Sequence, residues 1–234
     1  MAQNPVDAAK TKGPPPLRIA FVPGVTPGKW SRIWGQRVPR TRLEVAAVPE
    51  HDQLAVLHDG RADASFVRLP VDREGISLIP LYSEIPVVVV PTDHAVAAFD
   101  EVSVDDLADE HRVDVPSMTP KEAIELVATG AGIVIVPKSV ARLYDRKDVT
   151  HRPVTGVAET QIGLAWLTEA TDARIEMFIG IVRGRTERSS RAGDAPVPEK
   201  KVPEKKVPKS GQRKPAQRPV GKRGARGGRR GGGR

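Results

Sequence analysis

Short apolar runs alternate with amphipathic segments from residue 17 onward, and this alternation limits the fold more than any other feature. The runs LRIAFV (17–22), RLEVAAV (42–48) and ADASFVRL (62–69) have the length and apolar content of buried strands. Segments 29–38 and 51–60 stand between them and show helical spacing of apolar residues. The order strand, helix, strand, helix, strand predicts an α/β fold with mostly parallel sheets and right-handed crossovers.

The same kind of pattern continues to residue 186. Further strands are expected at 76–84, 85–91, 131–137, 149–154 and 160–168, and further helices at 103–109, 121–130, 138–145 and 170–186. The run IPVVVVP at 85–91 is apolar throughout, which is typical of a strand covered on both faces. One folded domain over residues 17–187 therefore follows a leader, residues 1–16, that we expect to be disordered.

The composition changes sharply after this domain. Residues 188–234 contain 16 Lys/Arg and 3 Asp/Glu, a net charge of +13, so residues 1–187 carry −5 of the total of +8. The segment VPEKKVPEKKVPK at 197–209 repeats every five residues and carries a proline in each repeat, which favours an extended spacer. The last residues, GKRGARGGRRGGGR, hold arginine spaced by glycine. We therefore expect residues 188–234 to form a disordered Lys/Arg/Pro/Gly-rich tail.

This charge asymmetry predicts a basic arm that binds nucleic acid, although a solubilising extension is the alternative. Flexible Lys and Arg side chains neutralise phosphates without reading sequence, so binding to DNA would be nonspecific and salt-sensitive. The choice between DNA and RNA stays open. The candidate nucleic-acid-binding residues are Lys214, Arg218, Lys222, Arg223, Arg226, Arg229, Arg230 and Arg234.

Residue usage excludes several classes of chemistry. The sequence has no cysteine, which removes disulfides, thiol catalysis and Cys-type zinc sites. None of the five histidines has metal-binding spacing, and no Ser-His-Asp elbow is present. We expect no metal, no cofactor and no enzymatic activity. No signal-peptide core or membrane-length apolar run occurs, which favours a cytoplasmic location, with association with the nucleoid as a further option.

Several motifs in succession resemble a known family. PLRIAFVPG, LHDGRADASFVR (57–68), GISLIPLYSEIPVVVVPTDHAVA and VATGAGIVIVP (127–137) follow the order found in the effector-binding domain of LysR-type transcriptional regulators. The resemblance covers roughly residues 16–185. It implies a type 2 periplasmic-binding-protein fold, with two α/β lobes and a small-molecule cleft between them. Lobe I would hold about 17–91 and 157–187, and lobe II about 92–156.

Two departures from the family pattern stand out. The N-terminal winged helix-turn-helix and linker helix of the family are absent, so we expect any DNA binding to come from the tail. The segment between LADE (107–110) and AIELVATG (123–130) is also short, where relatives usually place another strand and helix. This predicts a shortened second lobe and an altered half of the pocket.

The loop FVPGVTPG at 21–28 follows the first strand, at the sheet edge where open α/β folds bind ligands. Gly24 and Thr26 are ligand-binding candidates there. Thr26 can donate its hydroxyl to a ligand carboxylate, or it can cap the following helix.

Arg68 follows a buried strand, and an arginine in this position can bind a carboxylate ligand with two hydrogen bonds. The resemblance places the matching arginine beside the cleft in some acid-sensing relatives. The alternative is a structural ion pair with Glu50 or Asp63. Glu50 stands where relatives often carry Ser or Thr, and its carboxylate would disfavour an anionic ligand or would neutralise Arg68 and close the pocket.

Ser117 and Thr119 are the hydroxyls of the shortened second-lobe loop, and they either complete the ligand site or form a turn. The function expected is a transcription-related protein that senses a small-molecule effector, with a carboxylate as the suggested class, and that forms a homodimer or associates with other regulators. The alternative is an interaction scaffold or nucleoid- or RNA-associated protein whose effector domain has lost its ligand.

Overall fold

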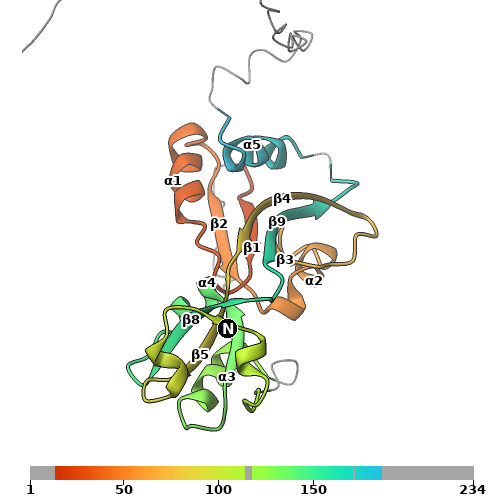
Figure 1. The fold of residues 1–234 in the computed structure, drawn as a ribbon. Coiled ribbons are helices and arrows are strands. Elements are labelled where there is room, and N and C mark those ends of the chain that lie inside the picture. Colours follow the sequence, from red (N-terminus) through yellow and green to blue (C-terminus); the bar gives the residue numbers. More distant parts are fainter. Residues whose placement is uncertain (1–13, 114–117, 171, 186–234) are drawn as a thin grey trace, which may run out of the picture. The chain divides into compact units, whose positions relative to one another are not determined.

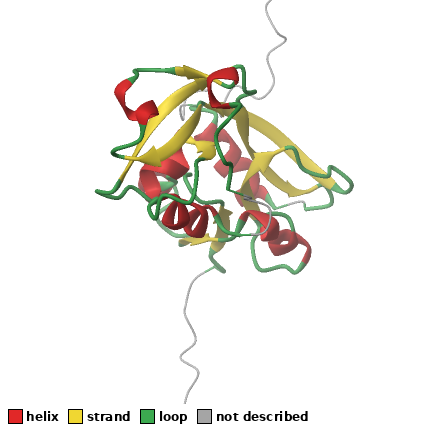
Figure 2. Ribbon diagram, turned by 60° about the horizontal axis from the view of Figure 1, so that its bottom comes forward, coloured by secondary structure: helices red, strands yellow, loops and turns green. Residues whose placement is uncertain are grey.

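A computed structural model describes residues 14–113, 118–170 and 172–185, which form two β-sheets with helices beside each (Figures 1 and 2). The chain divides into one unit of residues 1–193 and a second of residues 194–234. The second unit lies outside the described residues, and so do 1–13, 114–117, 171 and 186–193.

The first sheet has the strand order β2-β1-β3-β9-β4. Its strands are β1 (Leu17–Phe21), β2 (Leu43–Ala47), β3 (Ala64–Leu69), β4 (Ile76–Glu84) and β9 (Thr160–Leu167). The helices of this part are α1 (Gly28–Arg37), α2 (Ala55–His58) and α5 (Ala173–Val182), and a 3-10 helix, η1 (Glu50–Asp52), follows β2. Helices α1 and α5 contact each other beside this sheet (Figure 1).

The second sheet has the order β6-β8-β5-β7. Its strands are β5 (Pro86–Pro91), β6 (Val102–Ser103), β7 (Val134–Pro137) and β8 (Val149–Thr155), and its helices are α3 (Pro120–Val127), α4 (Lys138–Leu143) and the 3-10 helices η2 (Ala95–Ala98) and η3 (Asp105–Leu107). Strand β5 is buried on both faces, as its apolar run predicts. Helices α3 and α4 contact β5 and β7.

Both sheets are mixed, so the prediction of mostly parallel sheets is wrong. Among the described strands, four of seven pairings are antiparallel, and each of these involves β9 or β5. One residue, Ile85, separates β4 from β5, and four residues separate β8 from β9. The chain leaves the first sheet after β4 and re-enters it as β9, which runs antiparallel between β3 and β4. The apolar spacing of a strand does not record the direction in which it runs beside its neighbours.

The boundary between the lobes also differs from the expected one. The expected first lobe ends at residue 91, but β5 pairs with β7 and β8 in the second sheet. The chain therefore changes sheet at Ile85 and again between Thr155 and Thr160. An apolar run is common to buried strands of either sheet, and for this reason the run itself does not say which sheet it joins.

Two predicted helices are shorter than expected. Segment 51–60 holds the end of the 3-10 turn η1 and the single-turn helix α2. In segment 103–109, Ser103 ends strand β6 and the only helical turn is η3. Helix α2 ends before Gly60, whose φ of +64° is the left-handed conformation that glycine adopts readily.

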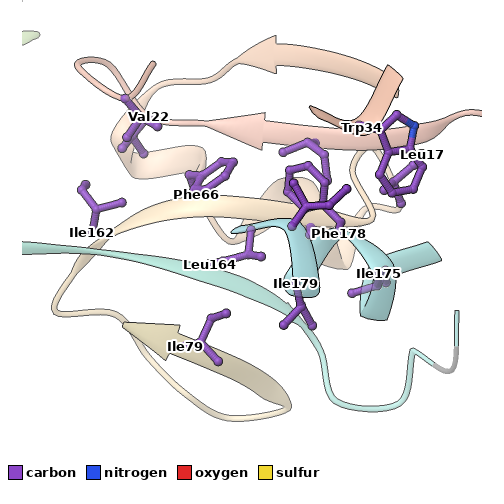
Figure 3. Close-up of a cluster of buried hydrophobic side chains, with 14 residues drawn as sticks. Leu17, Val22, Trp34, Phe66, Ile79, Ile162, Leu164, Ile175, Phe178 and Ile179 are labelled. Carbon is purple, nitrogen blue, oxygen red and sulfur yellow. The ribbon is translucent and has the colours of Figure 1, made fainter. Parts of the chain in front are cut away.

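The core of the first sheet is built around aromatic rings from three elements. Trp30 of α1 stacks on Phe66 of β3, with ring centroids 4.7 Å apart. Phe178 of α5 meets the edges of Phe66 and Trp34, each at 6.0 Å. Figure 3 shows Phe178 among Phe66, Leu164 and Ile179. Burying one such ring contributes about 1.5–3 kcal/mol, so α1 and α5 are held firmly on this part of the sheet.

Candidate functional site

Three of the predicted ligand-binding residues meet beyond the carboxyl ends of parallel strands β1, β2 and β3. Gly24 lies in the loop after β1, Glu50 begins η1 after β2, and Arg68 lies near the end of β3. Ligands of open α/β sheets bind at this edge. The structure brings Arg68 into contact with Glu50 and with the carbonyl of Pro23, the residue before Gly24.

The Arg68 guanidinium is paired inside the protein. Its Nε donates to Glu84 Oε2 at 2.7 Å and its Nη1 to Glu50 Oε2 at 2.6 Å. Its Nη2 donates to the carbonyl of Pro23 at 2.9 Å and to Glu84 Oε1 at 3.3 Å. The Arg68 side chain is 5% exposed. The structural ion pair weighed in the sequence is therefore present with Glu50, whereas Asp63 pairs with Arg18 instead.

Glu84 is the central residue that the sequence reasoning missed. Its side chain is 3% exposed, and its carboxylate also accepts hydrogen bonds from Ser139 Oγ and from Thr160 Oγ1 at 3.2 Å. It is the last residue of β4, directly before the change of sheet. The sequence does hold a sign of this role, namely an acidic residue at the end of a strand and next to an apolar run. A carboxylate buried there needs a cation or several hydrogen-bond donors as partners.

Gln53, another residue not foreseen, holds the Arg68 backbone. Gln53 Oε1 accepts from Arg68 N at 2.7 Å, and Gln53 Nε2 donates to Arg68 O at 3.2 Å. Glu50 and Gln53 belong to the same turn, since Gln53 N donates to Glu50 O at 3.2 Å. One short segment therefore both neutralises the Arg68 side chain and fixes its main chain.

The electrostatic balance in the cluster favours the charged guanidinium. Burial alone lowers the pKa of Arg68, but the hydrogen bonds and charge of Glu84, followed by those of Glu50, outweigh it and raise the pKa above its ordinary value. Burial and the Glu84 charge also raise the pKa of nearby Tyr82, which the Arg68 charge partly opposes. One arginine and two carboxylates give the cluster a formal charge of −1.

Gly24 approaches the second lobe closely. A β-carbon built on Gly24 would lie 2.5 Å from Ser139 Oγ of α4, and Gly24 has a φ of +94°. Only glycine fits such a contact in this backbone conformation. Gly24, Ser139 and Glu84 therefore join the loop after β1 to the start of α4, where the resemblance places a ligand cleft.

The other predicted ligand-binding residues lie apart from this cluster or outside the description. Thr26 is exposed, and α1 begins after Pro27 without a side-chain cap, so Thr26 does not take the alternative role of capping this helix. Thr119 is the N-cap of α3 and forms a capping box with Glu122. Ser117 and the eight tail residues proposed to bind nucleic acid lie outside the described residues.

Surface depressions occur elsewhere on the domain. One of about 240 Å³ lies between the end of α2 and the start of α5, beside Arg18 and Asp63. Another of about 180 Å³ lies between α3 and the end of α4, beside Lys121 and Tyr144. Several of their charged residues make ion pairs, for example Arg18 with Asp63 at 2.6 Å and Lys121 with Glu125 at 3.8 Å.

The histidines do not assemble a metal site in the part of the chain that the structure describes, where no group of three His, Asp or Glu side chains could hold an ion. His94 accepts a hydrogen bond from Val96 N at 3.2 Å and lies 3.3 Å from Glu110 Oε2. It therefore caps η2. None of the described helices is long and apolar enough to span a bilayer.

Comparison with known proteins agrees with this fold. Residues 14–120 match the family described as LysR substrate binding domain. Curated relatives include two proteins named probable hydrogen peroxide-inducible genes activator. That of Mycobacterium avium is 31% identical over 96 residues, which are 40% of this chain and 31% of the relative. That of Mycobacterium xenopi is 30% identical over 81 residues, 33% of this chain and 43% of the relative. The chain thus spans less than half the length of these relatives.

Solved structures show the same architecture. The BenM effector binding domain with its effector benzoate superimposes with a TM-score of 0.61 at 23% identity, covering 75% of this chain and 96% of that one. A cysteine-to-serine mutant of Corynebacterium glutamicum OxyR with bound H2O2 gives a TM-score of 0.61 at 20% identity, covering 76% and 70%. The curated relatives are named as activators of genes. Residues 14–120 therefore resemble the LysR substrate binding domain, and the described residues share the fold of the BenM and OxyR structures.

Proposed function

We propose that this chain acts in transcription control, with the LysR domain responding to a small neutral or cationic molecule and the basic C-terminal segment binding nucleic acid. The observation that carries the ligand class is the pairing of Arg68. Its guanidinium already has two carboxylate partners, and the cluster is left with a formal charge of −1. An anionic effector entering here would meet excess negative charge. This supports a different ligand class from the carboxylate that the sequence suggested.

The similar proteins support a response of this chain to a small molecule, but they do not identify its ligand. BenM was solved with benzoate, and the curated relatives are named for induction by hydrogen peroxide. The present sequence has no cysteine, so it offers no thiol for peroxide to oxidise. A reversible, non-covalent ligand is therefore the form of response that we propose.

The test compares three ligands of one shape, benzoate, benzamide and benzamidine, whose charges are −1, 0 and +1. Thermal unfolding of the full chain is followed with each at matched ionic strength, because a ligand of the folded state raises the melting temperature. We expect benzamide or benzamidine to raise it more than benzoate does. A larger rise with benzoate would contradict the proposed ligand class.

A second candidate function is an interaction scaffold in which the ligand has been lost. The contact of Gly24 with Ser139, together with the bonds from Ser139 and Arg68 to Glu84, favours it, because these groups occupy the junction of the two lobes. No response to any of the three ligands, or to a wider set of neutral and cationic compounds, would favour this function.

The proposal for the basic segment rests on charge. Residues 188–234 carry +13 and lie outside the described residues. Their Lys and Arg side chains would release counterions from phosphates and so bind without sequence preference. Deleting these residues should abolish salt-sensitive binding to unrelated DNA. We further propose that the chain works in the cytoplasm near the nucleoid, and that it pairs with itself or with other regulators.

A further inference from the structure

We propose that the Glu50 carboxylate occupies the position on the Arg68 guanidinium where a small carboxylate ligand would bind. We further propose that Glu50 alone keeps such ligands out of this site. The inference rests on the proposed function, in which the unaltered site rejects anions. It adds that the rejection comes from one removable side chain and that a carboxylate-binding site lies beneath it.

The two carboxylates on Arg68 are not equivalent. The Glu84 side chain is 3% exposed and accepts from Arg68, Ser139 and Thr160, so it is an internal part of the domain. The Glu50 side chain is 45% exposed and meets the guanidinium through Nη1. Buried Arg68 already has its charge balanced by Glu84. Glu50 is therefore the extra, solvent-facing carboxylate.

Arg68 does not depend on Glu50 for its position. Its Nε and Nη2 are held by Glu84 and by the carbonyl of Pro23. Its main chain lies within β3, and the Gln53 side chain forms hydrogen bonds with both the Arg68 amide and the Arg68 carbonyl. Truncation of the Glu50 side chain would leave the Nη1 group in place and without its carboxylate partner.

The space left by truncation has a defined chemistry. Replacing Glu50 by Ala deletes a methylene and a carboxylate, which together have the shape of acetate. It also changes the charge of the cluster from −1 to 0, and a bound acetate would restore both the charge and the hydrogen bond to Nη1. Guanidinium and carboxylate pair strongly through charge-assisted hydrogen bonds. The truncated site should therefore take small carboxylates.

The experiment follows thermal unfolding of the full chain with sodium acetate and with sodium benzoate, each compared with sodium chloride at equal ionic strength. We expect Glu50→Ala to show a saturable rise in melting temperature with acetate, half-complete in the millimolar range, as befits so small a ligand. The unaltered chain should show no rise beyond that in chloride. Acetamide, which has the same shape without the charge, should have no effect on Glu50→Ala.

Two further variants serve as controls. Glu50→Gln retains the shape and can still accept from Nη1, so it should not respond to acetate. Glu44→Ala removes a carboxylate of similar exposure, 42%, from an ion pair with Arg42, whose side chain is 77% exposed. Because that arginine is in water, Glu44→Ala should also not respond. If Glu50→Ala is unfolded by circular dichroism, Glu50→Ser removes the same carboxylate and replaces it in the titration.

The outcomes separate the inference from the proposed function. Stabilisation of the unaltered chain by acetate or benzoate would overturn the proposed ligand class, whatever the variants do. A silent unaltered chain together with a folded, silent Glu50→Ala would overturn the inference alone. An equal response of Glu44→Ala would show general salt binding and would also overturn the inference.

Discussion

Arg68 and Glu84 are both buried and form an ion pair, and each needs the opposite charge of the other to remain charged inside the protein. Removing water from a charge costs several kcal/mol, and the cost is offset only when a partner of opposite charge and further hydrogen bonds replace the water. Glu84 has such partners in Arg68, Ser139 and Thr160. Glu50 bonds the same guanidinium, but it remains close to half exposed, so water competes for its charge.

This difference predicts unequal costs of mutation. Glu84→Ala should lower the free energy of unfolding by about 3–5 kcal/mol, because it leaves a buried guanidinium without its main partner. Glu50→Gln should lower it by less than about 1 kcal/mol, as is usual for a partly exposed ion pair. Urea unfolding with equal m-values would measure both. Equal losses for the two variants would mean that Glu50 is as much a part of the buried network as Glu84.

At the scale of elements, two threonines predicted to bind the ligand, Thr119 and Thr26, differ in their contacts. Thr119 Oγ1 accepts from Glu122 N at 3.3 Å, and Glu122 Oε2 accepts from Thr119 N at 2.7 Å, which together begin helix α3. These bonds satisfy amide groups that a helix start leaves unpaired. Thr26 lies exposed before α1, whose N-cap is Pro27.

These two threonines give a matched comparison. Thr119→Ala should lower the free energy of unfolding by about 1 kcal/mol, since it removes the helix cap, and Thr119→Ser should restore most of it. Thr26→Ala should change it by less than about 0.5 kcal/mol, as for an ordinary surface residue. Denaturant titration of the three variants is the measurement. A larger loss for Thr26→Ala than for Thr119→Ala would contradict these assignments.

Much of the element pattern could be predicted from the sequence. The strands at 17–21, 64–69 and 86–91 and the helix at 173–182 lie where apolar spacing places them. Spacing is a local property, because a residue's neighbours along the chain decide which side chains share a face. The lengths of η1 and η3 were overestimated, since one or two turns of helical spacing do not show whether an α-helix continues.

For the whole molecule, charge is divided unevenly along the chain. Residues 1–187 carry −5 and residues 188–234 carry +13. On electrostatic grounds alone, we expect the acidic part to repel polyanions and the basic segment to attract them. Any affinity for nucleic acid should therefore follow the segment and not the domain.

We predict that the affinity of the full chain for nucleic acid depends steeply on salt concentration, and that this affinity comes from residues 188–234. The full chain should bind unrelated DNA and RNA duplexes, and its affinity should fall steeply as salt rises, whereas residues 1–187 should not bind. Fluorescence anisotropy over a range of salt concentrations measures this. Equal binding by residues 1–187 would place the nucleic-acid surface on the domain and would contradict the division of roles.

Most of the strands and helices, the likeness to LysR domains, and the positions of Gly24 and Glu50 after their strands and of Arg68 near the end of its strand could be read from the sequence alone. The position of β9 between β3 and β4, and the pairing of buried Glu84 with Arg68, become known from the three-dimensional structure. Arg68 lies in β3 and Glu84 in β4, and these two strands do not pair with each other. Both pair with β9, which follows Arg68 by about a hundred residues along the chain. The physical reason is that spacing reports which face of an element is buried, whereas the partner across that face depends on the path of the whole chain.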